Sequence, residues 1–156
     1  MFWIFKHPRL LKTILNSWPP FFWCGIRIRH LNADYQHSRV ELKWRPWTKN
    51  INRSQYGGSL YSMADPMFAL MLYGILGGER YQIWDKSSHI DYIKPGIGRL
   101  SADFKISDAQ IAEIKHHTEQ GEKYFPEFEV EVKDRRGEVV CRLRRTLYVR
   151  KRKHHR

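Results

Sequence analysis

The most conspicuous feature of the chain is an apolar stretch at residues 57–78, in which Asp65 is the only formally charged residue. A segment that is apolar on nearly all sides must be buried, either in a protein core or in a bilayer. A carboxylate near the middle of a bilayer costs about 2.5–3.5 kcal/mol, and Pro66 removes a helix hydrogen-bond donor. Glycine pairs at both ends of the stretch are typical of element boundaries. We therefore predict one long central helix, buried in a protein core and carrying a buried acid.

Apolar and polar residues alternate on both sides of this helix, which is the pattern of half-buried strands. The predicted strands are residues 21–31, 38–44, 81–92, 99–106, 127–132 and 139–149. A short helix over 109–117 follows a cap at Ser107 or Asp108. The simplest arrangement is an α+β domain in which an antiparallel sheet of about six strands wraps around a single helix.

The last two predicted strands form a hairpin, because Asp134–Gly137 between them has the composition of a four-residue turn. This turn places Glu129 opposite Arg142 and aligns the apolar residues of both strands on one face. Arg145 interrupts the apolar side of the last strand. It marks a bulge, or it reaches a partner subunit or a ligand.

The N-terminal segment predicts a short helix that opens at Pro8 and stops at Pro19-Pro20. We do not expect a signal peptide, because the segment has no continuous apolar core and no small-residue cleavage site. The apolar face of this helix consists of Leu10, Leu11, Ile14 and Leu15. We expect this face to dock onto the domain. The alternative is that it lies on a membrane surface, because aromatic and basic residues surround it.

A chain of 156 residues is most simply one domain, with a helical lead-in over 1–22, the main domain over 23–150 and a basic tail over 151–156. The net charge is +12, and residues 135–156 hold ten Lys or Arg against one acid. We interpret the tail as a solvated terminus; the alternative is attraction of nucleic acid, acidic lipid or a phosphorylated ligand. No nucleic-acid-binding motif accompanies it, so we expect no nucleic-acid partner.

Cysteine and histidine usage argues against a disulfide framework or a metal site. Cys24 and Cys141 are the only cysteines, and we expect both to be small buried or half-buried residues in a reducing, cytoplasmic compartment. The pairs His116-His117 and His154-His155 point apart on a helix or a strand, so we expect no bound metal. The core prediction for residues 57–78 likewise implies no integral membrane segment.

Four groups of residues carry a family pattern: Asn50, the segment Gly57–Asp65, the segment Ile90–Gly96 and the segment Asp134–Val140. Together they resemble the hotdog-fold acyl-CoA thioesterases, and most closely the bacterial domain family labelled tetrameric acyl-CoA thioesterase or DUF4442. The phenylacetyl-CoA thioesterase branch has Asn, two residues, Gly, two residues, His-Gly-Gly, and an Asp seven residues past the second glycine. The Asn, both adjacent glycines and the Asp keep that spacing here, whereas Tyr56 holds the His place and Arg53 the earlier Gly place.

The resemblance implies a hotdog domain over 23–150 that hydrolyses an acyl-CoA thioester, with coenzyme A as part of the substrate and no separate cofactor. It implies three catalytic residues: Asp65 as general base or nucleophile, the Gly58 N–H as oxyanion donor, and Asn50 as holder of the water or the carbonyl. For substrate binding it implies Tyr56, Gly57, Ser59, Arg53, Lys94 and Arg99. Hotdog sites form between subunits, so a homodimer or a homotetramer is implied.

Each of these roles has a structural alternative that the sequence leaves open. The glycine pair can be only a tight turn that starts a helix, and Asp65 can be a capping carboxylate before Pro66. Asn50 can be an ordinary turn residue, Tyr56 a packing residue, and the basic residues solvated surface charges. The alternative function is therefore a non-catalytic hotdog protein that binds acyl thioesters or serves as an assembly module.

Overall fold

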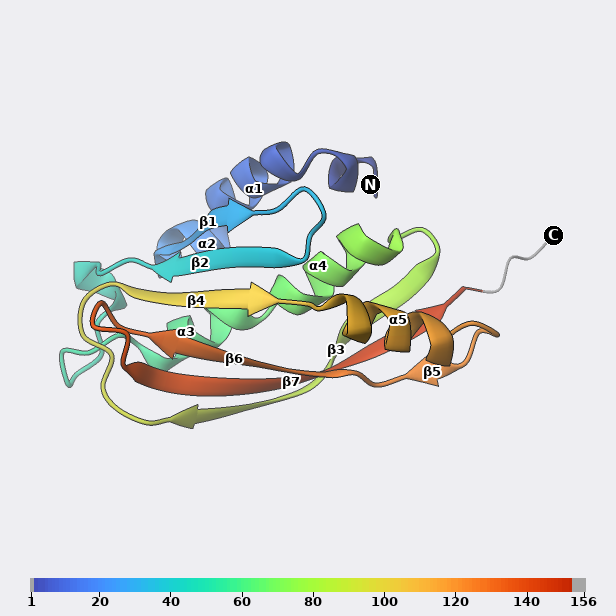
Figure 1. Ribbon diagram of the computed structural model, residues 1–156. Helices are drawn as coiled ribbons and strands as arrows, with labels where there is room; N and C mark the ends of the chain where they lie inside the picture. The colour runs from blue at the N-terminus through green and yellow to red at the C-terminus, as the bar shows by residue number, and fades with distance from the viewer. Residues whose placement is uncertain (1, 153–156) are drawn as a thin grey trace.

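The computed structural model describes residues 2–152, which form an α+β domain (Figure 1). Two short 3-10 helices, η1 and η2, accompany the α-helices and strands. In chain order the elements are η1 (Phe2–Lys6), α1 (Pro8–Ser17), α2 (Pro19–Cys24), β1 (Ile26–Leu31), β2 (His37–Leu42), η2 (Pro46–Thr48), α3 (Gly57–Ala64), α4 (Met67–Leu76), β3 (Tyr81–Tyr92), β4 (Leu100–Lys105), α5 (Asp108–His117), β5 (Lys123–Tyr124), β6 (Glu127–Lys133) and β7 (Val139–Lys151).

All of these strands belong to one sheet, and every neighbouring pair in it is antiparallel. The strand order is β1-β2-β4-β6-β7-β3, and the two-residue β5 pairs with the end of β7. The sheet curves around α3 and α4, which cover its inner face (Figure 1). This arrangement confirms the predicted α+β hotdog fold, and β5 is the strand that the alternation pattern does not predict.

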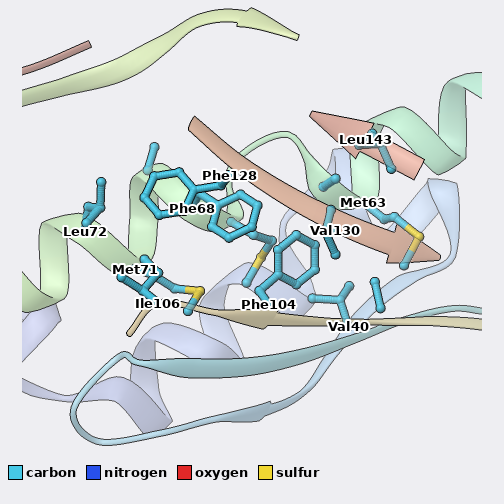
Figure 2. Packing of buried hydrophobic residues seen from close by; sticks show 14 of the residues in the cluster. Val40, Met63, Phe68, Met71, Leu72, Phe104, Ile106, Phe128, Val130 and Leu143 are labelled. Atoms are coloured by element: carbon cyan, nitrogen blue, oxygen red, sulfur yellow. The ribbon is translucent and has the colours of Figure 1, made fainter. Parts of the chain in front are cut away.

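The central stretch is apolar on nearly all sides because it fills the space inside the curved sheet. Phe68, near the start of α4, is 1% exposed; its ring stacks on Phe128 at 4.7 Å and meets Phe104 edge-on at 5.2 Å (Figure 2). Within residues 2–152, Gly57–Leu76 is the one stretch long and apolar enough to cross a membrane. Here it forms the core of the domain, as predicted, although a break at Asp65 and Pro66 divides it into two helices.

Helix α1 covers the free edge of β1 (Figure 1). The Asn16 side chain pairs with the backbone of Ile28: its Nδ2 donates to the carbonyl oxygen at 3.0 Å, and its Oδ1 accepts from the N–H at 2.7 Å. One amide side chain thus satisfies the edge as a neighbouring strand would. The predicted docking of α1 onto the domain is therefore confirmed, with Leu11 buried beneath the helix.

The other half of the predicted apolar face of α1 does not dock. Leu10 is 43% exposed and Ile14 is 50% exposed, although both belong to the face that the sequence predicts to be covered. Leu15, by contrast, is half-buried and packs against the core. The apolar residues of α1 therefore span a wider arc than the domain covers.

The segment immediately before β1 is a helix, so the prediction of a strand over 21–31 is wrong for its first residues. Pro19 and Pro20 occupy the first turn of α2, where a missing N–H removes no helical hydrogen bond. Gly25 ends the helix in the left-handed conformation, with φ of 75°. The prolines start a second helix rather than merely stopping the first, and the predicted boundary at residue 22 falls inside α2.

At the C-terminal end of the domain, β7 continues to Lys151, and residues 153–156 of the predicted tail lie outside the described residues.

The β6–β7 hairpin forms, but its register differs from the prediction by two residues. Glu129 lies opposite Arg144 rather than Arg142, because Lys133 pairs with Val139 beside the turn, one residue further on than predicted, and Val140 is then inserted as a bulge. Side chains alternate with a period of two, so a slip of two residues keeps every side chain on its predicted face. Opposite charges still meet, since Arg144 Nε donates to Glu129 Oε1 at 3.1 Å. Helix α5 needs no such correction: Ser107 caps it as predicted.

The aromatic contacts of Phe68 predict a large loss of stability when the ring is removed. Phe68→Ala leaves a cavity between α4 and the sheet, so the free energy of unfolding should fall by about 3–5 kcal/mol. Phe68→Leu, which keeps most of the volume, should lose less than half of that. Urea unfolding followed by circular dichroism measures both, and an equal loss in the two variants would contradict the packing described here.

Candidate active site at the α3–α4 helix and strand β7

Helix α3 begins with two glycines whose backbone N–H groups have no helical partner. Tyr56 is the N-cap, and its carbonyl oxygen accepts from the N–H groups of Ser59 at 2.9 Å and Leu60 at 3.3 Å. Among the described residues, none accepts a hydrogen bond from the N–H of Gly57 or Gly58. Free amide donors at the positive end of a helix dipole are suited to stabilise a developing negative charge.

Two tyrosine rings line the approach to these glycines. Tyr92, at the end of β3, donates from Oη to the Gly57 carbonyl oxygen at 3.1 Å. A Cβ atom added at Gly57 would lie 3.0 Å from Tyr92 Oη, and one added at Gly58 would lie 2.3 Å from Tyr56 Cε1. Tyr56 and Tyr92 are 60% and 56% exposed, so their rings border solvent as well as the helix end. A side chain at either glycine would therefore force one of these rings to shift.

A buried arginine joins the break between α3 and α4 to the sheet. Arg145 lies on the inner face of β7 and is 1% exposed. Its Nη2 donates to the backbone carbonyl oxygen and to Oδ1 of Asp65, both at 2.9 Å, and its Nε donates to Asp85 Oδ1 at 3.0 Å. Its guanidinium also lies 5.2 Å from the centre of the Tyr61 ring. Strand β7 does not bulge at Arg145; the side chain reaches two acids of its own chain.

Asp85 comes within reach of Arg145 where strand β3 is irregular. The β3–β7 register shifts between Asp85 and Ser87, and the Asp85 side chain is 24% exposed. Burial raises the pKa of Asp85 above its ordinary value, and the charge and hydrogen bond of Arg145 oppose this rise. The guanidinium therefore offsets the cost of holding a carboxylate in this part of the sheet.

Two buried polar atoms beside these ion pairs have no partner among the described residues. They are Arg145 Nη1 and Ser88 Oγ. Ser88 lies directly opposite Arg145 in the β3–β7 pairing, so both atoms belong to the same small region. A buried polar atom without a partner is uncommon and costs free energy. This region can therefore accept polar atoms from a ligand, from water or from a second chain.

The Asp65 side chain is 57% exposed, so the prediction that its carboxylate is buried in the apolar helix is wrong for the single chain. The reason is the helix break, because α3 ends at Ala64 and α4 starts at Met67. The predicted alternative of a capping role is not seen either, since no side chain caps α4. Instead, Oδ1 binds Arg145, and Oδ2 has no hydrogen-bond partner in the described part of the chain.

Asn50 organises the loop that leads into α3. Its Oδ1 accepts from the N–H of Asn52 at 3.0 Å and from both the N–H and the hydroxyl of Ser54 at 3.1 Å. Arg53 lies in this loop in the left-handed conformation, with φ of 55°, and its side chain is exposed. The observed role of Asn50 is to shape the loop that delivers Tyr56, and its contact with substrate stays a prediction.

Of the remaining predicted binding residues, Lys94 and Arg99 are engaged with acids elsewhere, and Ser59 follows Gly58 but is buried. Lys94 Nζ bonds to Asp134 Oδ2 at 2.8 Å and also to Glu138, so it fastens the β6–β7 turn; these hydrogen bonds, that of Asp134 first, raise the pKa of Lys94. Arg99 lies 3.8 Å from Glu41, on the face of the sheet opposite to α3. Ser59 is 3% exposed within α3.

Sequence reasoning missed Arg145 and Asp85 as parts of this site. The signal was present: an isolated cation on the apolar face of a strand and an isolated acid in an apolar helix are each costly alone, so each predicts the other as partner. Asp85 gave no signal, because the bulge that turns it inward is invisible in the alternation pattern. Over residues 2–152, no three His, Cys, Asp or Glu side chains are grouped closely enough to hold a metal ion.

Several solved structures have the same fold as this chain. A probable thioesterase of unknown function from Pseudomonas aeruginosa, PA5026, superposes with a TM-score of 0.83 at 18% identity, over 92% of this chain and 95% of that chain. The PaaI protein from the phenylacetic acid degradation operon of E. coli gives 0.63 at 17% identity, over 96% of both chains. Thioesterase HI1161 from Haemophilus influenzae gives 0.68 at 15% identity, over 96% of this chain and 94% of that chain.

These similarities show that the chain shares the hotdog fold of these proteins. Residues 7–149 match the domain of unknown function DUF4442, and the chain belongs to that family. Both assignments agree with the resemblance carried by the glycine pair, the Asp65 position and the β6–β7 turn. No curated protein sequence matches the chain.

The buried position of Arg145 predicts a strong dependence of stability on its charge partners. Arg145→Met leaves the half-buried Asp85 carboxylate without a counter-charge, so the free energy of unfolding should fall by about 3 kcal/mol. The double variant Arg145→Met/Asp85→Asn should regain part of that loss. Arg144→Met is the matched control: this neighbouring arginine is exposed and paired with Glu129, so its loss should cost less than about 1 kcal/mol. Equal effects of the two single variants in urea unfolding would contradict the arrangement.

Proposed function

We propose that the protein hydrolyses an acyl-CoA thioester to the free acid and coenzyme A. The observation that carries this proposal is the combination, on one helix, of unpartnered glycine N–H groups and a carboxylate held by a buried arginine. Membership of the DUF4442 family and structural similarity to proteins named as thioesterases support a thioesterase as the class of enzyme.

In the proposed reaction Asp65 acts as the general base. Arg145 fixes Oδ1, which leaves Oδ2 free to take a proton from a water molecule as its oxygen attacks the thioester carbonyl. The Gly58 N–H donates to the resulting oxyanion. Collapse of the tetrahedral intermediate breaks the carbon–sulfur bond, and the thiolate of coenzyme A leaves and takes up a proton. Tyr56, beside Gly58, forms a wall of the acyl pocket.

The two halves of this machinery belong to different copies of the chain in our proposal. Gly58 and Asp65 are seven residues apart along one helix, so at 1.5 Å per residue their backbones are separated by about 10 Å. One thioester carbonyl cannot be contacted from both positions. A second copy that pairs at the edge of β3 beyond Ile83, whose backbone groups Tyr73 occupies, would bring its own helix end to the first copy's Asp65. The exposure of Trp84 and Tyr92 on β3, 49% and 56%, supports a covered edge.

A non-catalytic hotdog module is the second candidate. One observation favours it: Asp65 already satisfies Arg145, and a carboxylate engaged in an ion pair can be purely structural. In this case the glycine N–H groups would bind an acyl thioester without hydrolysing it. A cytoplasmic location and the absence of a separate cofactor remain predictions under both candidates.

Removing the carboxylate of Asp65 should abolish most hydrolysis. Asp65→Asn keeps an oxygen for Arg145 but cannot take a proton, so kcat on acyl-CoA should fall at least about a hundredfold. Asp65→Ala should fall by a similar factor. Thiol release from short, medium and aromatic acyl-CoAs measures this. If the natural protein releases thiol and both variants release it equally well, the mechanism is refuted. If the natural protein releases no thiol from an acyl-CoA of any acyl length, the binding module is favoured.

The Gly58 N–H can be tested without confusing its loss with a steric effect. In a Tyr56→Ala background, the ring that a Cβ at residue 58 would strike is absent. In that background Gly58→Ala retains the N–H and Gly58→Pro removes it, with similar bulk at Cβ. The proline variant should be about a hundredfold slower than the alanine variant, because it lacks an oxyanion donor. Equal rates would exclude this amide from the reaction.

The same variants test whether the site joins two copies. The variant Asp65→Asn and the double variant Tyr56→Ala/Gly58→Pro are each expected to be inactive. If they are coexpressed, a mixed dimer contains one site with an intact Asp65 from one copy and an intact Gly58 from the other. Activity of the purified mixed dimer is the expected result, and a mixed dimer as inactive as its parents would place the site within one chain.

A further inference from the structure

A group of exposed aromatic and aliphatic side chains lies on the elements at the β1 end of the sheet. We call Leu10, Ile14, Trp18, Phe22, Trp23 and Trp47 the N-terminal apolar patch; they are between 43% and 63% exposed. Leu10 and Ile14 lie four residues apart on one face of α1, Trp18 joins α1 to α2 in an extended conformation, and Phe22 and Trp23 belong to α2. The Phe22 and Trp23 rings lie 5.5 Å apart, and Trp47 Nε1 donates to the Trp23 carbonyl oxygen at 3.0 Å. The patch is therefore built from α1, α2 and η2 together.

Basic residues accompany the patch, and its N-terminal segment contains no acidic residue. Residues 1–33 hold five Lys or Arg and no Asp or Glu. Arg45 adds another cation, with its guanidinium 5.5 Å from the centre of the Trp47 ring. Tryptophan is enriched where an apolar phase meets water, and basic residues are attracted to anionic lipid head groups. A face that combines the two has the composition of an interfacial membrane-binding surface.

A cationic cleft borders the patch between α1, α2 and β1. It encloses about 540 Å³, and Phe22 of the patch lines it together with Lys12, Arg27, Arg29, Lys43 and Arg45. Arg29 is paired with Glu41 at 2.6 Å, but no described residue supplies an acid to Arg27, Lys43 or Arg45. Partial burial and then the charges of four nearby arginines lower the pKa of Lys43. Such crowding of unpaired cations favours a bound anion.

We propose that the N-terminal apolar patch and this cleft form a docking surface for an anionic lipid bilayer. The aromatic side chains of α2 and η2 enter the head-group region, and the cleft receives lipid phosphate groups. The face lies at the β1 side of the sheet, away from β3 at the opposite edge (Figure 1). The protein would therefore lie on the membrane through α1 and α2 while the edge of β3 stays free. This proposal does not depend on the proposed thioesterase activity.

Vesicle flotation tests the docking surface directly. We expect the full chain to float with vesicles of phosphatidylglycerol and phosphatidylcholine in equal parts, and to stay behind with pure phosphatidylcholine. The double variant Phe22→Ser/Trp23→Ser removes part of the patch, and Arg27→Ser/Arg45→Ser removes unpaired cations of the cleft. Each should weaken the apparent affinity for the anionic vesicles by about tenfold or more, and raised salt should weaken binding by the natural chain.

Matched variants at other places on the protein distinguish binding through this surface from nonspecific electrostatic or hydrophobic adsorption. Lys115→Ser/Lys123→Ser removes the same number of charges from an exposed region near α5 and β5. Trp84→Ser removes an aromatic side chain that is 49% exposed on the opposite edge. Both should bind anionic vesicles as the natural chain does, and circular dichroism should show that every variant is folded.

Three results would overturn the proposal. The first is no flotation with anionic vesicles, and the second is a similar loss of binding in the control variants. The third is a self-associated natural chain that Phe22→Ser/Trp23→Ser converts to a smaller species, without vesicle binding in either form. That result, read from light scattering, would assign the patch to a second copy of the chain.

Discussion

The buried guanidinium of Arg145 is the interaction on which the site region depends. A charged group with 1% exposure is tolerable only if its donors are satisfied, and three acceptors from two segments supply most of that satisfaction. Two of those acceptors belong to Asp65 at the helix break, and the third belongs to Asp85 beside the irregularity in β3. The conformations of the helix break and of the strand are therefore coupled through one side chain of β7.

This coupling explains why the central stretch is not one uninterrupted helix. Pro66 cannot donate a backbone hydrogen bond, and the Asp65 carbonyl oxygen accepts a hydrogen bond from the Arg145 guanidinium. The break turns the carboxylate out to the surface, where it can meet a substrate or another chain. The same feature that costs a helical hydrogen bond thus creates an accessible acid next to a buried cation.

The fold was predictable because the alternation of apolar and polar residues is strong in most strands and because Asp65 and the glycine pair carry a family spacing. The prediction was wrong where one sequence pattern is compatible with two different structures. Pro19-Pro20 can stop one helix or start the next, and only the packing of Phe21 shows which occurs. The predicted hairpin register was wrong because the shift at the turn and the bulge at Val140 add up to two residues, and a slip of two leaves the pattern of faces unchanged. The exposure of Asp65 follows from the helix break at Pro66, which the uninterrupted apolar character of residues 57–78 led us to underrate.

The two edges of the sheet are treated differently, and this has a consequence for how copies of the chain can associate. Asn16 occupies the backbone groups of Ile28, so the β1 edge offers little to an incoming strand. On β3 the Tyr73 hydroxyl occupies Ile83 in the same manner, donating to its carbonyl oxygen at 2.6 Å and accepting from its N–H at 3.4 Å, but β3 continues from there to Tyr92. A strand that pairs antiparallel with its own copy generates a two-fold axis, and that contact is closed once made. A molecule that pairs through this later part of β3 therefore adds a single neighbour by that contact, and it cannot extend into a filament by repeating it.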